Sequence, residues 1–276
     1  MRDPVRMRDI VLFDLDFTLV PEDTRLLFAN YIFRRLPGRR LFLVILVPAA
    51  ALTFLGILSR SFFNRLFFCS LKGLKTDELE ALADDFVQRH IPFYADMLDI
   101  LQQAKSGGAT VVLATASPAL YIKPLARYLG ADITLCTEWV PAPRHPLLVR
   151  YETEYNKGAA KIRALLPHLP EAIQSQMKRI SEGRPYYIPR SSAFSDSPND
   201  LPMLLLAEQA AVVHPSPGLK AIALRKGWRI LQPAPVDSPA RRRIRGLLQG
   251  LGLFPLFDRR FSIASTDSLP NLHSQL

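Results

Sequence analysis

Four short motifs of chemistry-bearing residues occur along the chain, each at the end of a predicted strand or at the start of a predicted helix. In order, they are Asp14-Leu15-Asp16-Phe17-Thr18-Leu19-Val20, Thr115-Ala116-Ser117-Pro118, Asn156-Lys157-Gly158 and Phe194-Ser195-Asp196-Ser197-Pro198-Asn199-Asp200. In open α/β sheets, ligands bind at the carboxyl edge of the strands. We therefore expect these motifs to lie together at the carboxyl edge of one sheet and to bind a phosphate group there.

The residue types suit phosphoryl transfer. Asp14 is the predicted nucleophile, because a carboxylate can attack phosphorus and form an aspartyl-phosphate, which splits one hard displacement into two easier ones. Asp16, two residues later, is predicted to protonate the leaving alcohol and then to activate water. The Thr115 hydroxyl can hydrogen-bond a phosphoryl oxygen, and Lys157 is expected to add fixed positive charge.

An anionic phosphate repels a carboxylate nucleophile unless cations cover the charge. Mg²⁺ suits this role because it takes oxygen ligands octahedrally and tolerates water and substrate phosphate in its shell. We expect Asp14, Asp16, Asp196 and Asp200 to hold it, with Asp16 contributing its carbonyl oxygen. Ser117 is expected either to contact the substrate phosphate or to act as a helix N-cap.

The elements that must position these motifs alternate between apolar runs and helix-like stretches. Residues 10–13 and 109–114 are short, continuous apolar runs, as buried parallel strands have, and residues 211–213 indicate a late strand. This alternation predicts an α/β fold with a Rossmann-like, mainly parallel sheet and helices on both faces. The catalytic core is expected to comprise residues 1–20 and 92–231.

The ordered set of motifs, spanning roughly residues 8–215, closely resembles the haloacid dehalogenase superfamily. The first motif of that family is Asp-x-Asp-x-Thr, and the fourth ends in a paired aspartate. The aspartate at position 16 favours phosphatases and phosphomutases, because dehalogenases lack an acid there and P-type pumps carry Thr. Phe17 departs from the pattern, since Gly or a small residue is usual there, and so does Ser195, where Gly is common.

The resemblance places an all-helical cap after the first strand, at residues 21–91. This cap contains an uncharged apolar segment, residues 41–58, in which twelve residues are Leu, Ile, Val or Phe. These residues favour membrane insertion by roughly 4 to 7 kcal/mol before the penalties of Pro, Gly and Thr. A buried core helix is the alternative. A single crossing would separate Asp14 from Asp196, so we expect the segment to return or to lie in the interface, with Pro48 breaking it into two short helices.

The formal net charge of +10 fits nucleic acid, an anionic membrane or a phosphorylated substrate. Nucleic acid is not expected as a partner, because the basic runs adjoin apolar stretches and lack interleaved stacking aromatics. Basic residues flank both ends of the apolar segment, as they would on one cytoplasmic membrane face. These residues are Arg34, Arg35, Arg39, Arg40, Arg60 and Arg65. The basic tail, residues 232–276, is expected to be loosely ordered, either as a second surface anchor or as a solvated end.

Within the superfamily, the chain resembles the phosphoserine-phosphatase-like branch and, more narrowly, bacterial phosphatidylglycerophosphate phosphatases. That family shares the Arg34-Arg35 pair before a long apolar segment and a stretch like Asp85-Phe86-Val87. The resemblance implies hydrolysis of phosphatidylglycerophosphate to phosphatidylglycerol at the cytoplasmic face of the bacterial inner membrane. Arg34 and Arg35 are candidate headgroup contacts, or simply face lipid phosphates.

Three alternatives stay open. The first is a soluble-metabolite phosphatase acting, for example, on phosphoserine or a sugar phosphate. The second is phosphoryl transfer to an acceptor other than water. The third is a non-catalytic membrane-interaction protein with a relict site, against which the intact acidic motifs argue. The sequence leaves the oligomeric state open.

Overall fold

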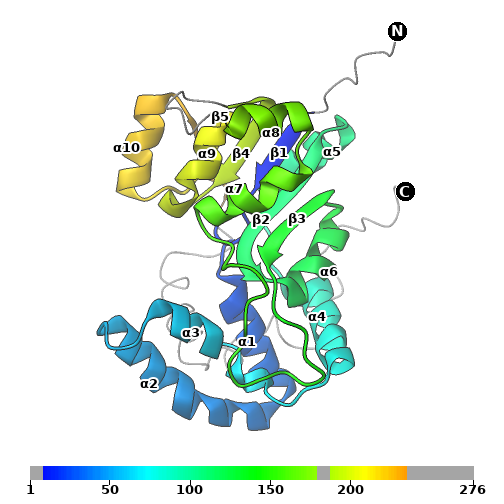
Figure 1. Cartoon of the computed structure of the whole chain (residues 1–276), viewed down its shortest axis with the longest axis vertical. Coiled ribbons are helices and arrows are strands. Elements are labelled where there is room, and N and C mark those ends of the chain that lie inside the picture. The colour runs from blue at the N-terminus through cyan, green and yellow to red at the C-terminus, as the bar shows by residue number, and fades with distance from the viewer. Residues whose placement is uncertain (1–8, 179–186, 235–276) are drawn as a thin grey trace. The chain divides into compact units, whose positions relative to one another are not determined.

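The computed structural model describes residues 9–178 and 187–234. These residues form two compact units, both seen in Figure 1. The α/β unit comprises residues 9–24, 92–140, 151–178 and 187–234, and the helical unit comprises residues 25–91 and 141–150. The expected tail, residues 232–276, lies outside the described residues except for its first three.

Six strands build one sheet in the α/β unit, in the order β3-β2-β1-β4-β5-β6. Their bounds are β1 (Ile10–Phe13), β2 (Thr110–Pro118), β3 (Ile133–Thr137), β4 (Ile188–Ser195), β5 (Ala207–Val213) and β6 (Arg229–Leu231). Every neighbouring pair is parallel, which confirms the predicted Rossmann-like sheet. The strand order reverses between β1 and β4, and the carboxyl ends of strands at such a switch point form the binding crevice of this architecture.

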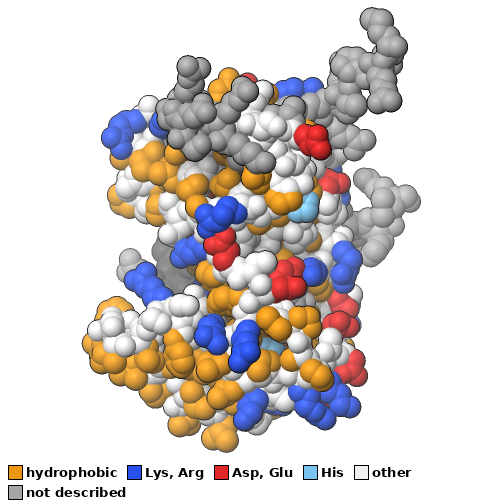
Figure 2. Space-filling view, in the orientation of Figure 1, with side chains coloured by type: hydrophobic (Ala, Val, Ile, Leu, Met, Phe, Trp, Pro, Cys, Tyr) orange, Lys and Arg blue, Asp and Glu red, His pale blue; other side chains and the backbone are white. Residues whose placement is uncertain are grey.

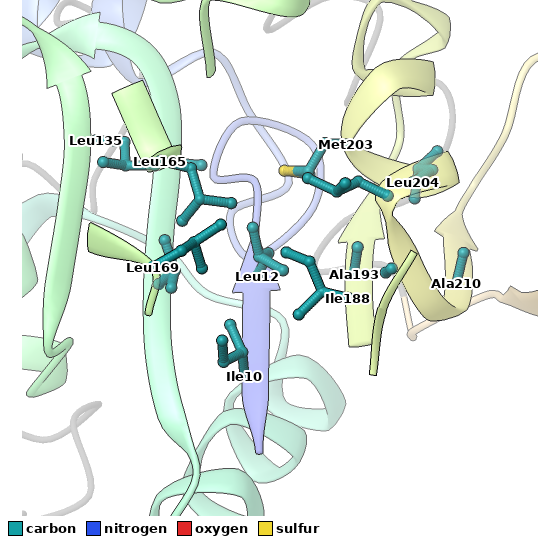
Figure 3. Packing of buried hydrophobic residues seen from close by; sticks show 14 of the residues in the cluster. Ile10, Leu12, Leu135, Leu165, Leu169, Ile188, Ala193, Met203, Leu204 and Ala210 are labelled. Atoms are coloured by element: carbon teal, nitrogen blue, oxygen red, sulfur yellow. The ribbon is translucent and has the colours of Figure 1, made fainter. Parts of the chain in front are cut away.

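Helices of the α/β unit pack against this sheet and fix its central strand. Their bounds are α5 (Ala95–Ser106), α6 (Ala119–Leu129), α7 (Ala159–Leu165), α8 (Glu171–Lys178), α9 (Leu201–Leu206) and α10 (Pro217–Lys226), with 3₁₀ helices at Leu166–His168 and Pro198–Asp200. Figure 3 shows Leu12 of β1 packed among Leu165 of α7 and Met203 of α9. On the opposite face of the strand, Phe13 stacks on Phe194 with ring centroids 4.8 Å apart. Both contacts hold the end of β1, where Asp14 follows.

The helical unit contains α1 (Thr24–Arg35), α2 (Leu43–Phe54), α3 (Arg60–Leu66) and α4 (Thr76–His90), with 3₁₀ helices at Pro37–Phe42 and Cys69–Leu71. Its interior includes Phe28, Tyr31 and Phe86, whose rings lie within 6.1 Å of one another between centroids. The Tyr31 hydroxyl donates to Asp85 Oδ2 at 2.6 Å, which ties α1 to α4.

Residues 141–150 belong to the helical unit, although they lie inside the range expected for the catalytic core. The Gly73 N–H donates to the His145 carbonyl at 2.8 Å, and the His145 N–H donates to the Leu74 carbonyl at 2.9 Å. A segment that follows β3 therefore pairs with the connection before α4.

The apolar segment, residues 41–58, does not divide at Pro48, so that prediction is wrong. The helix α2 continues through Pro48 to Phe54. Pro48 removes one backbone hydrogen bond, but the run Ala49-Ala50-Ala51 that follows has the highest helix propensity and extends the helix. The chain turns instead at Gly56, whose φ is 76°, before α3.

Candidate active site

A buried ion-pair network joins the ends of β1 and β4. Lys161 Nζ lies 2.7 Å from Asp14 Oδ1 and 2.9 Å from Asp200 Oδ2. The hydroxyl of Ser195 donates to the same Asp200 oxygen at 2.8 Å. Lys161 is 3% exposed, and both aspartates are buried. The predicted aspartates Asp14 and Asp200 are thus brought together by one lysine.

That lysine is Lys161, whereas Lys157 was expected from the sequence to supply the positive charge. Lys157 is exposed and precedes α7. Lys161 is the third residue of α7 and shares its buried side with Ala160 and Leu165. The four-residue spacing from Lys161 to Leu165 is the signal that would have found it, because such residues lie on one helix face.

Gly158 sets the approach of α7 to the fourth motif. Its backbone has φ 60° and ψ −125°, a conformation that residues with a Cβ rarely adopt. A Cβ at this position would lie 3.3 Å from the Asn199 carbonyl oxygen. Glycine therefore allows the start of α7, and with it Lys161, to lie close to the loop that carries Asp196 and Asp200.

Asp16 is held by hydrogen bonds from two sides. Its Oδ1 accepts from the Thr24 N–H at 2.7 Å, and its Oδ2 accepts from the Ser117 hydroxyl at 2.9 Å. The Thr24 hydroxyl lies 3.2 Å from the Ser117 hydroxyl and 3.3 Å from that of Tyr121. Burial raises the pKa of Tyr121 well above its usual value, so this phenol stays neutral. Ser117 does not cap α6, whose N-cap is Pro118.

Thr18 links the first motif to the fourth, a role that the sequence analysis missed. Its hydroxyl accepts from the Asp196 N–H at 3.0 Å and donates to Asp14 Oδ2 at 3.4 Å. The loop that carries Thr18 is tight, because the N–H groups of residues 18, 19 and 20 all donate to the Leu15 carbonyl. Phe17 in this loop has φ 61°, a left-handed conformation that costs a residue with a Cβ about 1–2 kcal/mol.

The second motif is held in place by Asn156. Thr115 is fully buried, and its hydroxyl accepts from the Ser117 N–H at 3.1 Å. The Asn156 side-chain amide donates to the Thr115 carbonyl at 2.9 Å, and its own N–H donates to the Thr137 hydroxyl at 3.1 Å. Asn156 of the third motif therefore positions Thr115 within β2.

The predicted headgroup residues Arg34 and Arg35 end α1 in the helical unit. Arg35 Nη2 lies 3.2 Å from Asp85 Oδ2, and Arg89 pairs with the same carboxylate at 3.3 Å. The hydrogen bond with Tyr31 and the charge of Asp85 raise the pKa of Arg35 further. Arg35 therefore has a structural partner within its own unit.

The carboxylates of the site lie close enough for their negative charges to repel one another. Burial, followed by repulsion from Asp200 and Asp196, raises the pKa of Asp14 to about 8 against the attraction of Lys161. Burial and the charges of Asp200 and Asp16 raise the pKa of Asp196 to about 7. The charge of Lys161 therefore does not bring the pKa of either aspartate down to its usual range, and a bound cation would lower both pKa values.

The residues present fit Mg²⁺. Asp14, Asp196 and Asp200 are the candidate side-chain ligands, and Lys161 contacts only one carboxylate oxygen of Asp14 and one of Asp200. In the part of the chain that the structure describes, no three His, Cys, Asp or Glu side chains form a ready-made metal cluster. Mg²⁺ is commonly bound through one or two carboxylates and keeps several waters in its shell.

Comparison with known protein families shows the family to which this chain belongs. Residues 11–205 match the haloacid dehalogenase-like hydrolase family. The chain belongs to this family. Membership confirms the predicted superfamily and the prediction of an enzyme, a hydrolase.

Relatives with curated names are distant. A probable phosphatase of Mycobacterium tuberculosis strain H37Rv is 25% identical over 240 residues, which cover 82% of this chain and 76% of that protein. A histidinol-phosphatase of Neisseria meningitidis serogroup C is 25% identical over 238 residues, which cover 82% of this chain and 99% of that protein. Both names describe phosphatases, and only the second gives a substrate.

Solved structures share the fold. A Bordetella pertussis protein of unknown function aligns with a TM-score of 0.65 and 23% identity, covering 82% of this chain and 99% of that one. A probable phosphoserine phosphatase of Vibrio cholerae aligns with a TM-score of 0.56 and 15% identity, covering 89% of this chain and 65% of that one. These likenesses confirm the predicted α/β fold class.

Proposed function

We propose that this protein is a Mg²⁺-dependent phosphomonoesterase that works through an aspartyl-phosphate on Asp14. The observation that carries the proposal is the contact of 2.7 Å between Lys161 Nζ and Asp14 Oδ1 at the switch point of the sheet. Asp16 lies two residues further on, with its carboxylate held by Ser117. The chain thus carries a nucleophile, a fixed cation and a second carboxylate at one strand end, and several relatives are named phosphatases.

The reaction has two displacements. In the first, an Asp14 carboxylate oxygen bonds to phosphorus, the bond from phosphorus to the ester oxygen breaks, and the leaving alcohol takes a proton from Asp16. In the second, Asp16 accepts a proton from a water molecule that attacks phosphorus, which releases phosphate and restores Asp14. The hydroxyl of Thr115 is proposed to hydrogen-bond a phosphoryl oxygen. Lys161 offsets negative charge throughout.

Mg²⁺, held by Asp14, Asp196 and the Asp16 carbonyl, would supply the positive charge that lets an anionic phosphate approach an anionic nucleophile. Without such charge, the raised pKa of Asp14, about 8, keeps part of this group protonated at neutral pH and so unable to attack. Thr18 supports both ligands, because its hydroxyl contacts Asp14 Oδ2 and the Asp196 N–H.

The proposed substrate is a membrane lipid phosphate, specifically phosphatidylglycerophosphate, hydrolysed to phosphatidylglycerol at the cytoplasmic membrane face. Two features support it. The sequence resembles phosphatidylglycerophosphate phosphatases in the Arg34-Arg35 pair and the apolar segment that follows. The helix α2 is almost wholly apolar and exposed, as a protein working at a bilayer would have it.

A soluble phosphomonoester is the second candidate substrate. The relative that the chain covers over 99% of its length is named histidinol-phosphatase, and a relative that is 28% identical over 162 residues is named phosphoserine phosphatase. At such identities the substrate-contacting residues are free to differ, so the two substrate classes have to be separated by assay.

Phosphate release would be measured with Mg²⁺ on phosphatidylglycerophosphate in mixed micelles, phosphoserine, histidinol phosphate and an aryl phosphate. The Asp14→Asn variant and excess chelator serve as blanks. We expect Mg²⁺-dependent turnover that both blanks abolish, with the lipid preferred over the soluble esters. Turnover of the soluble esters alone would refute the lipid substrate and keep the mechanism. Equal activity in Asp14→Asn would refute the mechanism.

A further inference from the structure

The helix α2 presents an apolar surface on three of its sides. Of its twelve residues, only Leu46 and Ala49 are buried. They pack in a cluster with Phe33 of α1 and Leu66 of α3. The exposed large side chains of α2 and of the loop that follows include Val44 (71% exposed), Phe54 (92%), Leu55 (67%) and Ile57 (68%). Figure 2 shows hydrophobic side chains gathered over this part of the helical unit.

This surface is unusual for a protein bathed in water. Burying one large apolar side chain contributes about 1.5–3 kcal/mol, and contiguous exposed patches of this kind mark interaction sites. Pro37–Phe54 is also long and apolar enough to cross a membrane by length and composition, and only 11% of it is buried within the structure. A partner that covers the apolar surface is therefore favoured.

The charges around α2 indicate the kind of partner. Between Thr24 and Thr76 the sequence contains nine Lys and Arg residues and no Asp or Glu. Arg40 Nε donates to the Phe33 carbonyl at 3.2 Å, and Arg65 Nε donates to the Val149 carbonyl at 2.9 Å. These contacts orient the guanidinium groups without neutralising them. An anionic surface is complementary to this stretch, and each cation near such a surface contributes about 1 kcal/mol.

A shallow hollow lies where the chain enters α2. Its volume is about 410 Å³, and it is lined by Arg35, Leu36, Pro37, Gly38, Arg39 and Phe42. Cationic and apolar groups line it together, which is the combination that a lipid phosphate and its first methylene groups require.

We propose that α2 and the loop to α3, residues 43–59, form a docking surface for an anionic bilayer, lying in the interface without crossing it. Length and composition alone would let Pro37–Phe54 cross the ~30 Å hydrocarbon core, so the path of the chain decides between crossing and lying in the interface. Asp14 precedes this surface in the chain and Asp200 follows it, yet both contact Lys161. The chain therefore enters and leaves on the same side of the bilayer.

A second copy of the chain is the less suitable occupant. Face-to-face packing would bring two acid-free, basic stretches together, and their repulsion opposes association. The bilayer supplies both an apolar layer for the surface and anionic headgroups for the arginines. This inference is independent of the catalytic proposal, because binding is measured with the inactive Asp14→Asn chain.

Docking would be tested by sedimentation of the full-length Asp14→Asn chain with phosphatidylglycerol–phosphatidylcholine vesicles and with phosphatidylcholine vesicles. Adding Leu55→Ser is expected to weaken binding to the anionic vesicles about tenfold or more. Leu224→Ser is the matched control, since Leu224 in α10 is 65% exposed and Leu55 is 67% exposed. We expect Leu224→Ser to bind like its parent. Absence of binding to anionic vesicles, or equal loss in both variants, would overturn the proposal.

The contribution of positive charge to vesicle binding is tested with a matched pair of arginine variants. Arg60→Gln, beside the docking surface, is expected to weaken binding to anionic vesicles about fivefold. Arg225→Gln, on α10, is expected to leave it unchanged. Binding to neutral vesicles as tight as to anionic ones would contradict the electrostatic part. Concentration-dependent dimers that Leu55→Ser abolishes, without vesicle binding, would instead assign the surface to a second copy.

The depth of α2 in the bilayer is measured with the Ala50→Trp variant, which places a fluorophore in the middle of this helix. Lipids brominated near the headgroups are expected to quench it more strongly than lipids brominated near the chain ends. The reverse order would mean that α2 reaches the bilayer centre, and would overturn the interfacial position.

Discussion

Lys161 Nζ lies 2.7 Å from Asp14 Oδ1 in an environment where the lysine is only 3% exposed. A buried charge of this kind is stable only when paired, and Lys161 has two carboxylate partners, Asp14 and Asp200. Removing either partner would leave a buried charge uncompensated, and Lys161 sets the charge beside the proposed nucleophile.

Exchanging each of the two lysines for methionine separates their roles. Lys161→Met is expected to lower phosphate release on an aryl phosphate by about 10²–10³-fold. It should also lower the free energy of unfolding by about 3–5 kcal/mol, because it leaves two buried carboxylates without their cation. Lys157→Met, at an exposed position before α7, is expected to change neither quantity markedly. Activity kinetics and thermal unfolding measure these two quantities. A larger loss in Lys157→Met than in Lys161→Met would contradict the role assigned to Lys161.

Stability without metal should depend on pH through Asp14. Its folded-state pKa of about 8 exceeds the ordinary aspartate value of 3.8, so the folded state holds this proton more tightly than the unfolded chain. The associated stability is full below about pH 4 and is lost as pH rises through 8. We therefore expect the Tm of the wild type, relative to Asp14→Asn, to fall between pH 4 and 8 in chelator.

The ionisation of Asp14 is also expected to make Mg²⁺ binding depend on pH. Mg²⁺ binds the ionised form, so its stabilisation of the wild type is expected to grow over that range. Asp196, with a pKa of about 7, contributes in the same direction between about pH 4 and 7. Parallel Tm curves for the wild type and Asp14→Asn across the range would show that Asp14 is not perturbed.

Gly158 tests whether the backbone positions Lys161. Gly158→Ala places a Cβ in a left-handed conformation and 3.3 Å from the Asn199 carbonyl, which is expected to cost about 1–3 kcal/mol of stability and to lower activity. Gly218→Ala is the matched control, because nothing lies within 4 Å of its added Cβ in α10. We expect it to be neutral or stabilising by up to about 1 kcal/mol. Chemical denaturation of both variants measures the difference, and equal effects would refute the role of Gly158.

Thr18 tests the link between the two predicted metal ligands. Thr18→Val keeps the shape of the side chain but removes the hydroxyl that contacts the Asp196 N–H and Asp14 Oδ2. The Mg²⁺ concentration for half-maximal activity is expected to rise about 10–100-fold, as for other residues that orient metal ligands. Thr18→Ser restores the hydroxyl and should largely restore the Mg²⁺ requirement. A normal Mg²⁺ titration in Thr18→Val would rule out this positioning.

The exposed α2 shows the boundary between local and tertiary information. Its apolar character is evident from residues 41–58 alone, because hydrophobicity is a property of composition. The break expected at Pro48 was wrong, since the helix-favouring alanines after it carry α2 onward to Phe54. The helix-breaking effect of one proline is opposed by the helix propensity of the residues around it. A rule applied to one residue at a time does not include that opposing contribution.

The sequence by itself determined the parallel α/β core, the position of Asp14 after β1 and the acidic motifs around it. These features follow from short-range patterns: a buried strand is a run of apolar residues, and the residues directly after it must lie at the carboxyl edge of the sheet. Thr18 and Asp16 were visible in the same motif.

Only the tertiary structure decided which lysine reaches Asp14 and which hydroxyls hold Asp16. Lys157 and Lys161 are equally basic and four residues apart, but only Lys161 lies in α7, so the choice depends on where that helix begins and which face turns toward the end of β1. Thr24 and Tyr121 are separated by 97 positions, yet their hydroxyls lie 3.3 Å apart. Such contacts are made by packing between distant segments, for which a single sequence carries no local signal.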